Sequence, residues 1–184
     1  MDWIDRLSTG WKAWVLLFAL TITAAAPGVF NLPALDRDES RFAQASKQYL
    51  ETGDYITIRY QDEYRNKKPA GIHWLQAGST AAFGEGEHLD VWTYRVPSWI
   101  GAGLATLMAF WVGIAAIGRR GAFVGAALFG SSLLLTSEAH ISKTDGVLVF
   151  LITAAMGCLL RLYLRKDNDR KLAIAFGVVH GAGF

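Results

Sequence analysis

The sequence predicts an all-α integral membrane protein, built as a bundle of transmembrane helices with one long polar loop. Its composition is 52% hydrophobic and only 18% charged, with seven tryptophans. Charge-free apolar runs recur along the chain, and a run of about 20 residues is enough for a helix to cross the hydrocarbon core. Most of the remaining charge is gathered between the first and second runs, in residues 36–95. That loop is expected to carry helices lying at the membrane surface.

The first run, "AWVLLFALTITAAAPGVFNLPAL" at 13–35, is long enough to span with length to spare. A signal peptide cleaved after Ala26 is disfavoured, because the apolar stretch continues well beyond that residue and Pro27 would become the first residue. The remaining predicted spans are 96–118, 121–137, 146–160 and 172–184. The last run has thirteen residues. We therefore expect a fifth span that is incomplete, and a chain that is the N-terminal part of a longer protein.

Basic residues in the short loops predict the orientation in the membrane. Arg119 and Arg120 separate the second and third runs, and residues 161–171 hold five Lys and Arg between the fourth and fifth. The loop "EAHISKTD" at 138–145 has only Lys143. The positive-inside rule therefore places the N-terminus and the two basic loops in the cytoplasm. The 36–95 and 138–145 loops are expected to lie together on the outer face.

Local signals predict a helix at the start of the long loop. Asp36 followed by Glu39 resembles a capping box, and Gly53 is a typical residue after a helix C-terminus. The helix expected over 37–51 places four residues on one face, namely Asp38, Phe42, Ala45 and Tyr49. Its apolar members suit contact with a bilayer surface. Arg41 lies one turn after Asp38, within pairing reach.

A second charged site is predicted before the next helix. "DYITIRY" at 54–60 is expected to be extended, and the polar loop after it ends at Lys67 and Lys68. Pro69 fits the first position of a helix over 69–83. Two ammonium groups beside the free N–H groups and positive dipole end of a helix form a plausible phosphate site.

Each of these residues also has a simpler interpretation. Asp36, Asp38 and Asp145 could be helix caps, and the two lysines could contact lipid headgroups. Tryptophans and tyrosines near the spans suit the interfacial belt, and His140 has no companion at metal-ligand spacing. Cys158 is the only cysteine, so the chain has no internal disulfide. What favours function is that acids, an arginine and a lysine pair are all predicted on one side of the membrane.

Four segments resemble the N-terminal half of GT-C glycosyltransferases. In chain order they are "DRDESRFAQASKQYLETGDY", "NKKPAGIHWLQ", "YRVPS" and "EAHISKTDGVLVF". They are most similar to the bacterial group of lipid A aminoarabinose transferases and relatives of the protein O-mannosyltransferases. The "DE" followed by an Arg-aromatic pair and the "KP" before a short helix are specific in combination.

The resemblance implies a GT-C-like helix bundle in the bacterial inner membrane, with its active site on the periplasmic face. Such enzymes move a sugar from a polyprenyl-phosphate carrier to a hydroxyl or phosphate on a lipid or protein acceptor. Asp38 matches the catalytic base, and Asp145 matches a second catalytic acid near the site. Arg41 and Lys68 match groups that meet the carrier phosphate, and Lys67 is expected to join them.

The resemblance also implies a role for Glu39 and bears on whether a divalent metal binds. Glu39 completes the "DE" pair and is expected to support the site. Lys67 departs from the lipid A group, which often has an acid there that has been linked to metal binding. A lysine at this position favours purely cationic handling of the phosphate, so no cofactor is predicted and a divalent metal is doubtful.

Two other classes of function stay open. A transporter or flippase for lipid-linked sugars would also place cations at the interface, but it should have ionisable groups inside its spans. The first four predicted spans have none. A non-catalytic membrane scaffold would not need acids and cations to converge. No nucleic-acid partner is expected.

Overall fold

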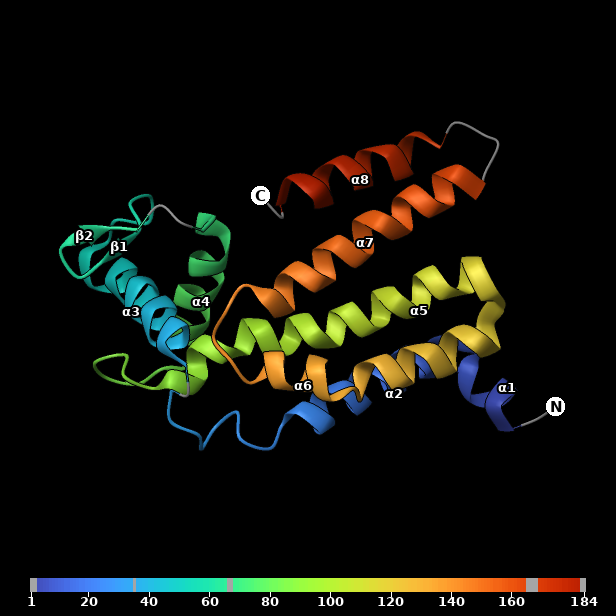
Figure 1. The fold of residues 1–184 in the computed structure, drawn as a ribbon, viewed down its shortest axis with the longest axis horizontal. Coiled ribbons are helices and arrows are strands. Elements are labelled where there is room, and N and C mark those ends of the chain that lie inside the picture. The colour runs from blue at the N-terminus through green and yellow to red at the C-terminus, as the bar shows by residue number, and fades with distance from the viewer. Residues whose placement is uncertain (1–2, 35, 66–67, 165–168, 183–184) are drawn as a thin grey trace.

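The computed structural model describes residues 3–34, 36–65, 68–164 and 169–182, and it is mostly helical (Figure 1). The helices are α1 (Trp3–Ser8), α2 (Gly10–Ala25), α3 (Arg37–Thr52), α4 (Ala70–Phe83), α5 (Val91–Gly130), α6 (Leu133–Ala139), α7 (Asp145–Leu164) and α8 (Arg170–Ala182). Between α3 and α4, β1 (Arg59–Tyr60) and β2 (Glu63–Tyr64) pair as a two-stranded antiparallel hairpin. The extended segment expected at 54–60 therefore includes one strand, and the polar loop after it supplies the other.

Helix α2 is shorter than the apolar run that contains it. It ends at Ala25, and Ala26 precedes Pro27. Ala26 keeps helical backbone angles, but Pro27 has no N–H to donate to the Thr23 carbonyl, so the helical hydrogen bonds stop there. Gly28 then takes a left-handed φ of 92°, so the chain leaves the helix as a turn. The helical part of 13–35 is thus only its first half, and these limits as a membrane span stay a prediction.

Helix α5 turns back on itself at Gly118, whose φ of 77° and ψ of 168° are not helical (Figure 1). Its two antiparallel halves correspond to the apolar runs at 96–118 and 121–137. The second half ends at Gly130, and α6 restarts after Ser132, whose hydroxyl caps it by accepting from the Leu135 N–H at 3.4 Å. The helix expected over 121–137 is therefore broken in two.

Small residues let these helices approach closely. A Cβ placed on Gly101 of α5 would lie 2.8 Å from the carbonyl carbon of Gly146 in α7. A Cβ on Gly113 would lie 2.8 Å from that of Ala122, across the α5 turn. On the other side of α5, Leu17 of α2 packs in a buried cluster with Phe110. Such contacts are typical of helices that associate within a membrane.

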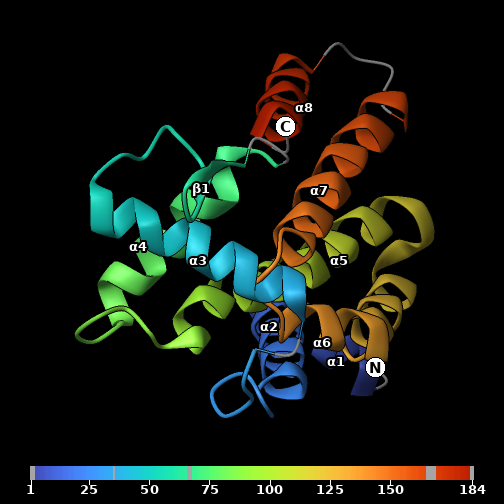
Figure 2. The same ribbon diagram turned by 60° about the vertical axis from the view of Figure 1, so that its left-hand side comes forward.

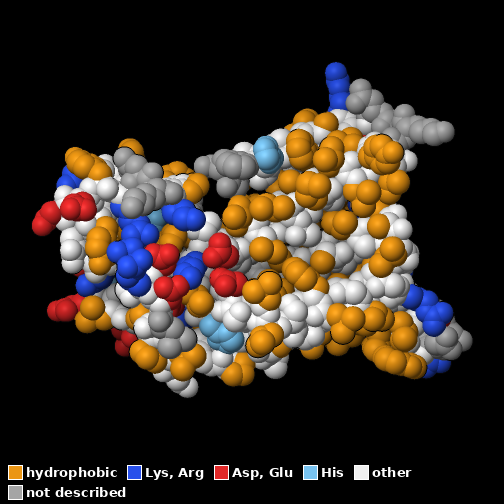
Figure 3. Space-filling view, in the orientation of Figure 1, with side chains coloured by type: hydrophobic (Ala, Val, Ile, Leu, Met, Phe, Trp, Pro, Cys, Tyr) orange, Lys and Arg blue, Asp and Glu red, His pale blue; other side chains and the backbone are white. Residues whose placement is uncertain are grey.

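The polar residues are distributed toward the two ends of the helical bundle. At one end, Arg120 of the α5 turn forms an ion pair with Asp5 of α1 at 3.0 Å. At the other end lie α3, α4, the hairpin and the loop between α6 and α7 (Figures 1 and 2). On the face seen in Figure 3, hydrophobic side chains are spread over the bundle between the two ends. Within the described ranges, Val91–Gly130 and Asp145–Leu164 are the helices long and apolar enough to cross a membrane.

Helix α3 is packed on protein along the face that was expected to meet the bilayer. Phe42 and Tyr49 are almost fully buried, and the Phe42 ring stacks on the His73 ring of α4 at a centroid distance of 5.3 Å. Ala45 and Tyr49 share a core with Ile58 of the loop after α3. The prediction that this apolar face lies on the bilayer was therefore wrong, because α4 and the segment leading into β1 cover it.

Candidate functional site

The two acids in the first turn of α3, Asp38 and Glu39, point in different directions. Asp36 is the N-cap, and its carboxylate accepts the Asp38 N–H at 3.1 Å, as predicted. Asp38 is exposed, and its Oδ1 lies 3.5 Å from Nη1 of Arg41, one turn along. Glu39 is fully buried. The predicted catalytic acid and phosphate-binding arginine are thus brought together on an accessible surface.

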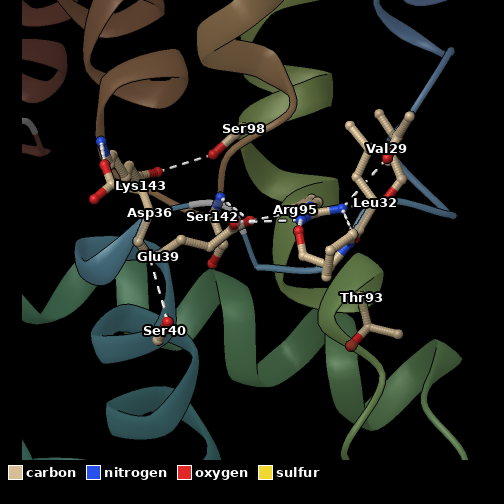
Figure 4. Close-up of polar contacts among 12 residues, drawn as sticks. Val29, Leu32, Asp36, Glu39, Ser40, Thr93, Arg95, Ser98, Ser142 and Lys143 are labelled. Carbon is tan, nitrogen blue, oxygen red and sulfur yellow. Dashed lines mark hydrogen bonds and ion pairs between the residues drawn. The ribbon is translucent and has the colours of Figure 1, made fainter.

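Glu39 forms a buried ion pair with Arg95 of α5 (Figure 4). The guanidinium donates from Nε to Oε1 at 2.7 Å and from Nη2 to Oε2 at 3.2 Å. Its Nη1 also donates to the carbonyls of Val29 and Leu32 at 2.9 and 2.8 Å, and its Nη2 to that of Pro33 at 2.9 Å. Arg95 therefore fixes the chain between α2 and α3 to the start of α5.

The contacts of the Glu39 side chain differ from those of the predicted capping box. In that motif it would accept the Asp36 N–H. Within the described residues its Oε1 instead accepts the Ser142 N–H at 3.1 Å, in addition to its contacts with Arg95. Glu39 thus joins α3 to the loop between α6 and α7 (Figure 4).

A buried chain of hydrogen bonds continues from Ser142 into α4. Nε2 of Gln76 donates to Oγ of Ser142 at 2.9 Å, and Oγ of Ser46 donates to Oε1 of Gln76 at 2.7 Å. Oγ of Ser46 also lies 2.9 Å from Nδ1 of His73. Because the single Ser46 proton goes to Gln76, His73 carries its proton on Nδ1. Burial, and secondarily the charge of Arg65, lowers the pKa of His73 to about 4, so the imidazole is neutral.

The loop at 138–145 makes a second link to α3. Lys143 forms an ion pair with Asp36, and its carbonyl accepts from Ser98 of α5 at 2.8 Å. The Lys143 hydrogen bond lowers the pKa of Asp36, and the Asp36 hydrogen bond raises the pKa of Lys143. Burial, and then the neighbouring Asp145, raise the pKa of Glu138. Asp145 is the first residue of α7, so the loop brings this acid toward α3.

A small polar pocket lies beside Arg41, the partner of Asp38. Its volume is about 190 Å³. It is lined by Arg41 of α3 and by the hairpin residues Tyr60, Glu63, Tyr64 and Arg65. The Arg65 guanidinium lies over the Phe42 ring, 5.5 Å from its centroid, and within the described part of the chain its buried Nε has no hydrogen-bond partner.

Lys68 is exposed immediately before the α4 cap Pro69, and the helix starts at Ala70, one residue later than predicted. Lys67 lies outside the described residues, so the structure says nothing of its role. Among the described residues, no hydrogen bond or ion pair joins Lys68 to Asp38 or Arg41. Apolar grooves run along α4 from this point. One of about 400 Å³ extends from Pro69 along α7, and one of about 390 Å³ lies between α4, α5 and α7.

The residues that hold this site together were not identified from local sequence patterns. They are Arg95, which lies within "YRVPS", and Ser46, His73 and Gln76, which stand outside the specific "DE" and "KP" motifs. An arginine directly before an apolar run is a signal that could have identified Arg95, since a charge there needs a buried partner. Within the described ranges, no group of three His, Cys, Asp or Glu side chains could hold a metal ion.

Comparison with known proteins gives a consistent picture. The sequence profile described as dolichyl-phosphate-mannose-protein mannosyltransferase (PMT) matches residues 12–184. The undecaprenyl phosphate-alpha-4-amino-4-deoxy-L-arabinose arabinosyl transferase 2 of Pseudomonas fluorescens is 29% identical over 176 residues, which are 91% of this chain and 30% of that protein. The corresponding transferase of Pseudomonas savastanoi pv. phaseolicola is 32% identical over 152 residues, which are 80% of this chain and 27% of that protein.

The fold has a match among solved structures. The crystal structure of ArnT from Cupriavidus metallidurans bound to undecaprenyl phosphate superposes with a TM-score of 0.74 at 23% sequence identity. The match covers 92% of this chain and 31% of that one. The chain thus spans about 30% of the length of the relatives it matches.

Proposed function

The chain belongs to the dolichyl-phosphate-mannose-protein mannosyltransferase family, and from this premise we propose that the protein is a glycosyltransferase that uses a polyprenyl-phosphate-linked sugar. The acceptor is a hydroxyl or phosphate on a lipid or protein. The observation that carries the proposal is the accessible pair of Asp38 and Arg41, 3.5 Å apart on the first turn of α3. At that distance, the acid can act on the attacking acceptor hydroxyl while the cation contacts the leaving carrier phosphate in the same glycosyl transfer.

Asp38 is the proposed general base. It takes the proton of the acceptor hydroxyl as the acceptor oxygen bonds to the anomeric carbon, since a neutral hydroxyl is a weak nucleophile. The bond from that carbon to the carrier phosphate breaks, and the phosphate leaves with the bonding electrons. Arg41 and Lys68 stabilise the charge that develops on it, with Lys67 as a further cation from the sequence. Asp145 supports the site electrostatically, and Glu39 positions α3.

The carrier chain is proposed to lie in the apolar grooves beside α4. Lys68 and the N-terminus of α4 stand at the Pro69 end of one groove, where a phosphate would be favoured. The adjoining surfaces of α4 and α7 are apolar, as an isoprenoid tail requires. The Cupriavidus ArnT bound to undecaprenyl phosphate and the names of the relatives make undecaprenyl phosphate-4-amino-4-deoxy-L-arabinose the first donor to test.

The site is proposed to face the periplasm of a bacterial inner membrane, in a multi-pass protein. The support is the separation of the Arg119–Arg120 turn from α3 and α4, at opposite ends of the bundle (Figure 1). Cysteines introduced at exposed Asp62 and Lys171, with Cys158 replaced by Ala, should react with impermeant reagents from opposite faces of the membrane. Reaction of both from one face would contradict this topology.

A flippase is the second candidate, and the location of the charges disfavours it. The acids and cations of the site lie on α3, in the loop before α4 and at the first residue of α7, outside the predicted spans. The deciding experiment supplies the full-length protein in membranes with the donor and with lipid A or a peptide, and measures the product by mass. Sugar on the acceptor supports the transferase. Donor movement between leaflets without transfer would favour the flippase.

A further inference from the structure

The hairpin between α3 and α4 forms a pocket whose chemistry differs from that of the apolar grooves. The grooves beside α4 have volumes of about 400 and 390 Å³ and are lined mostly by apolar side chains. The hairpin pocket has a volume of about 190 Å³ and is lined by two arginines, a glutamate and two tyrosines. Pockets for drug-sized ligands begin at about 300 Å³. The hairpin pocket is therefore suited to one small polar group and not to an isoprenoid chain.

We propose that this hairpin pocket, lined by Arg41, Tyr60, Glu63, Tyr64 and Arg65, holds the single sugar ring of the donor. The inference rests on the proposed function and adds to it the place where the sugar is recognised. Arg41 both lines the pocket and pairs with Asp38 at 3.5 Å. A ring in the pocket would therefore have its anomeric carbon near the proposed base and its phosphate near the proposed cation.

The lining residues offer the contacts that a sugar ring uses. Tyrosine rings combine an apolar face, which covers ring C–H groups, with a polar hydroxyl. Glu63 accepts from hydroxyl or ammonium groups, and Arg65 donates to ring oxygens. The Arg65 guanidinium is already held over the rings of Phe42 and Tyr60, at 5.5 and 6.0 Å from their centroids. Its buried Nε has no partner among the described residues, so a ligand could supply one.

The test separates recognition of the sugar from recognition of the carrier. Binding of undecaprenyl phosphate-4-amino-4-deoxy-L-arabinose and of undecaprenyl phosphate alone is measured for the full-length protein and for Glu63→Gln and Arg65→Gln. Each variant should bind the sugar-bearing donor about tenfold more weakly, the usual order for one charge-assisted hydrogen bond. Binding of undecaprenyl phosphate alone should change less than about twofold. Asp62→Asn is the matched control, because Asp62 is the exposed acid next to Glu63 and does not line the pocket.

Three results would overturn the inference. Unchanged donor binding in both variants would mean that the pocket does not contact the sugar. Equal weakening of both ligands would assign the pocket to the phosphate. A raised KM for the acceptor with normal donor binding would assign it to the acceptor. In each case sugar transfer by the unaltered protein would leave the proposed function standing, so the two failures are distinguishable.

Discussion

Removing one partner of the buried pair between Glu39 and Arg95 should strongly destabilise the fold. The two side chains are 0% and 1% exposed, so water cannot replace a lost partner. Breaking a buried ion pair from one side costs about 3–5 kcal/mol, against a total stability of about 5–15 kcal/mol for a typical domain. Either change therefore removes a large part of the free energy of folding.

The structure distinguishes the two single substitutions. Glu39→Gln keeps one acceptor oxygen for the guanidinium, and the carbonyls of Val29, Leu32 and Pro33 still accept from it. We expect this variant to lose about 3 kcal/mol of its free energy of unfolding. Arg95→Met leaves the buried carboxylate without the guanidinium and removes the donor to those carbonyls as well. We therefore expect this variant to lose about 5 kcal/mol of its free energy of unfolding.

The assay is denaturant-induced unfolding of the full-length protein in detergent micelles, followed by tryptophan fluorescence. Glu51→Gln is the control, because it breaks the i,i+4 pair of Lys47 with exposed Glu51 on the same helix, which should contribute about 0.3–0.5 kcal/mol. Double replacement by Glu39→Gln and Arg95→Met should cost less than the sum of the single changes, since no charge is left buried. Losses below about 1 kcal/mol for both single variants would refute the reasoning, because the pair would then behave like a surface pair.

Three further predictions concern the site. Asp38→Asn should lower single-turnover transfer by roughly 10²- to 10⁴-fold with donor binding kept, because an amide keeps the size of the side chain but cannot take a proton, while Asp145→Asn should cost less. Near-normal transfer by the first variant would remove Asp38 as the base. Lys68→Ala, and less severely Arg41→Ala, should weaken turnover of the donor, because losing a charge-assisted contact to phosphate costs a few kcal/mol in a desolvated site. Turnover measured at low donor concentration would show this loss. Normal turnover there would make both residues lipid anchors. The pKa of His73, lowered from 6.5 to about 4, means that the unfolded chain binds a proton between these values that the folded chain does not. The free energy of unfolding should therefore fall as the pH drops from 6.5 and level off below about 4. Thermal unfolding measured across this pH range should show the dependence in the unaltered protein and not in His73→Asn.

Local chemistry was enough to predict the elements that carry the site. Asp36 caps α3 and Gly53 ends it, with φ of 71° and its N–H donated to the Tyr49 carbonyl at 3.0 Å. The predicted position of Asp145 at the head of α7 was also correct. These features depend on residues within a few positions of one another, so sequence patterns contain the information needed.

The partners of the buried groups could not be predicted in the same way. Glu39 and Arg95 are 56 positions apart, and Glu39 and Ser142 are 103 apart. Nothing in the local pattern distinguishes a glutamate that closes a capping box from one that pairs across the fold. The same limit explains the apolar face of α3, since periodicity identifies a buried face but not whether lipid or α4 covers it.

The contrast between adjacent Asp38 and Glu39 shows how the fold holds the proposed base in place. Consecutive helical residues point about 100° apart, so one carboxylate can be buried while its neighbour stays accessible. Glu39 joins the first turn of α3 to Arg95 and to the loop that leads to Asp145, while Asp38, paired with Arg41, stays exposed to a substrate. Glu39→Gln should therefore lower the rate of transfer per folded molecule as well as the stability. Because the donor phosphate is assigned to Arg41 and Lys68, donor affinity should fall less than this rate, and the opposite order would argue that Glu39 acts on donor binding.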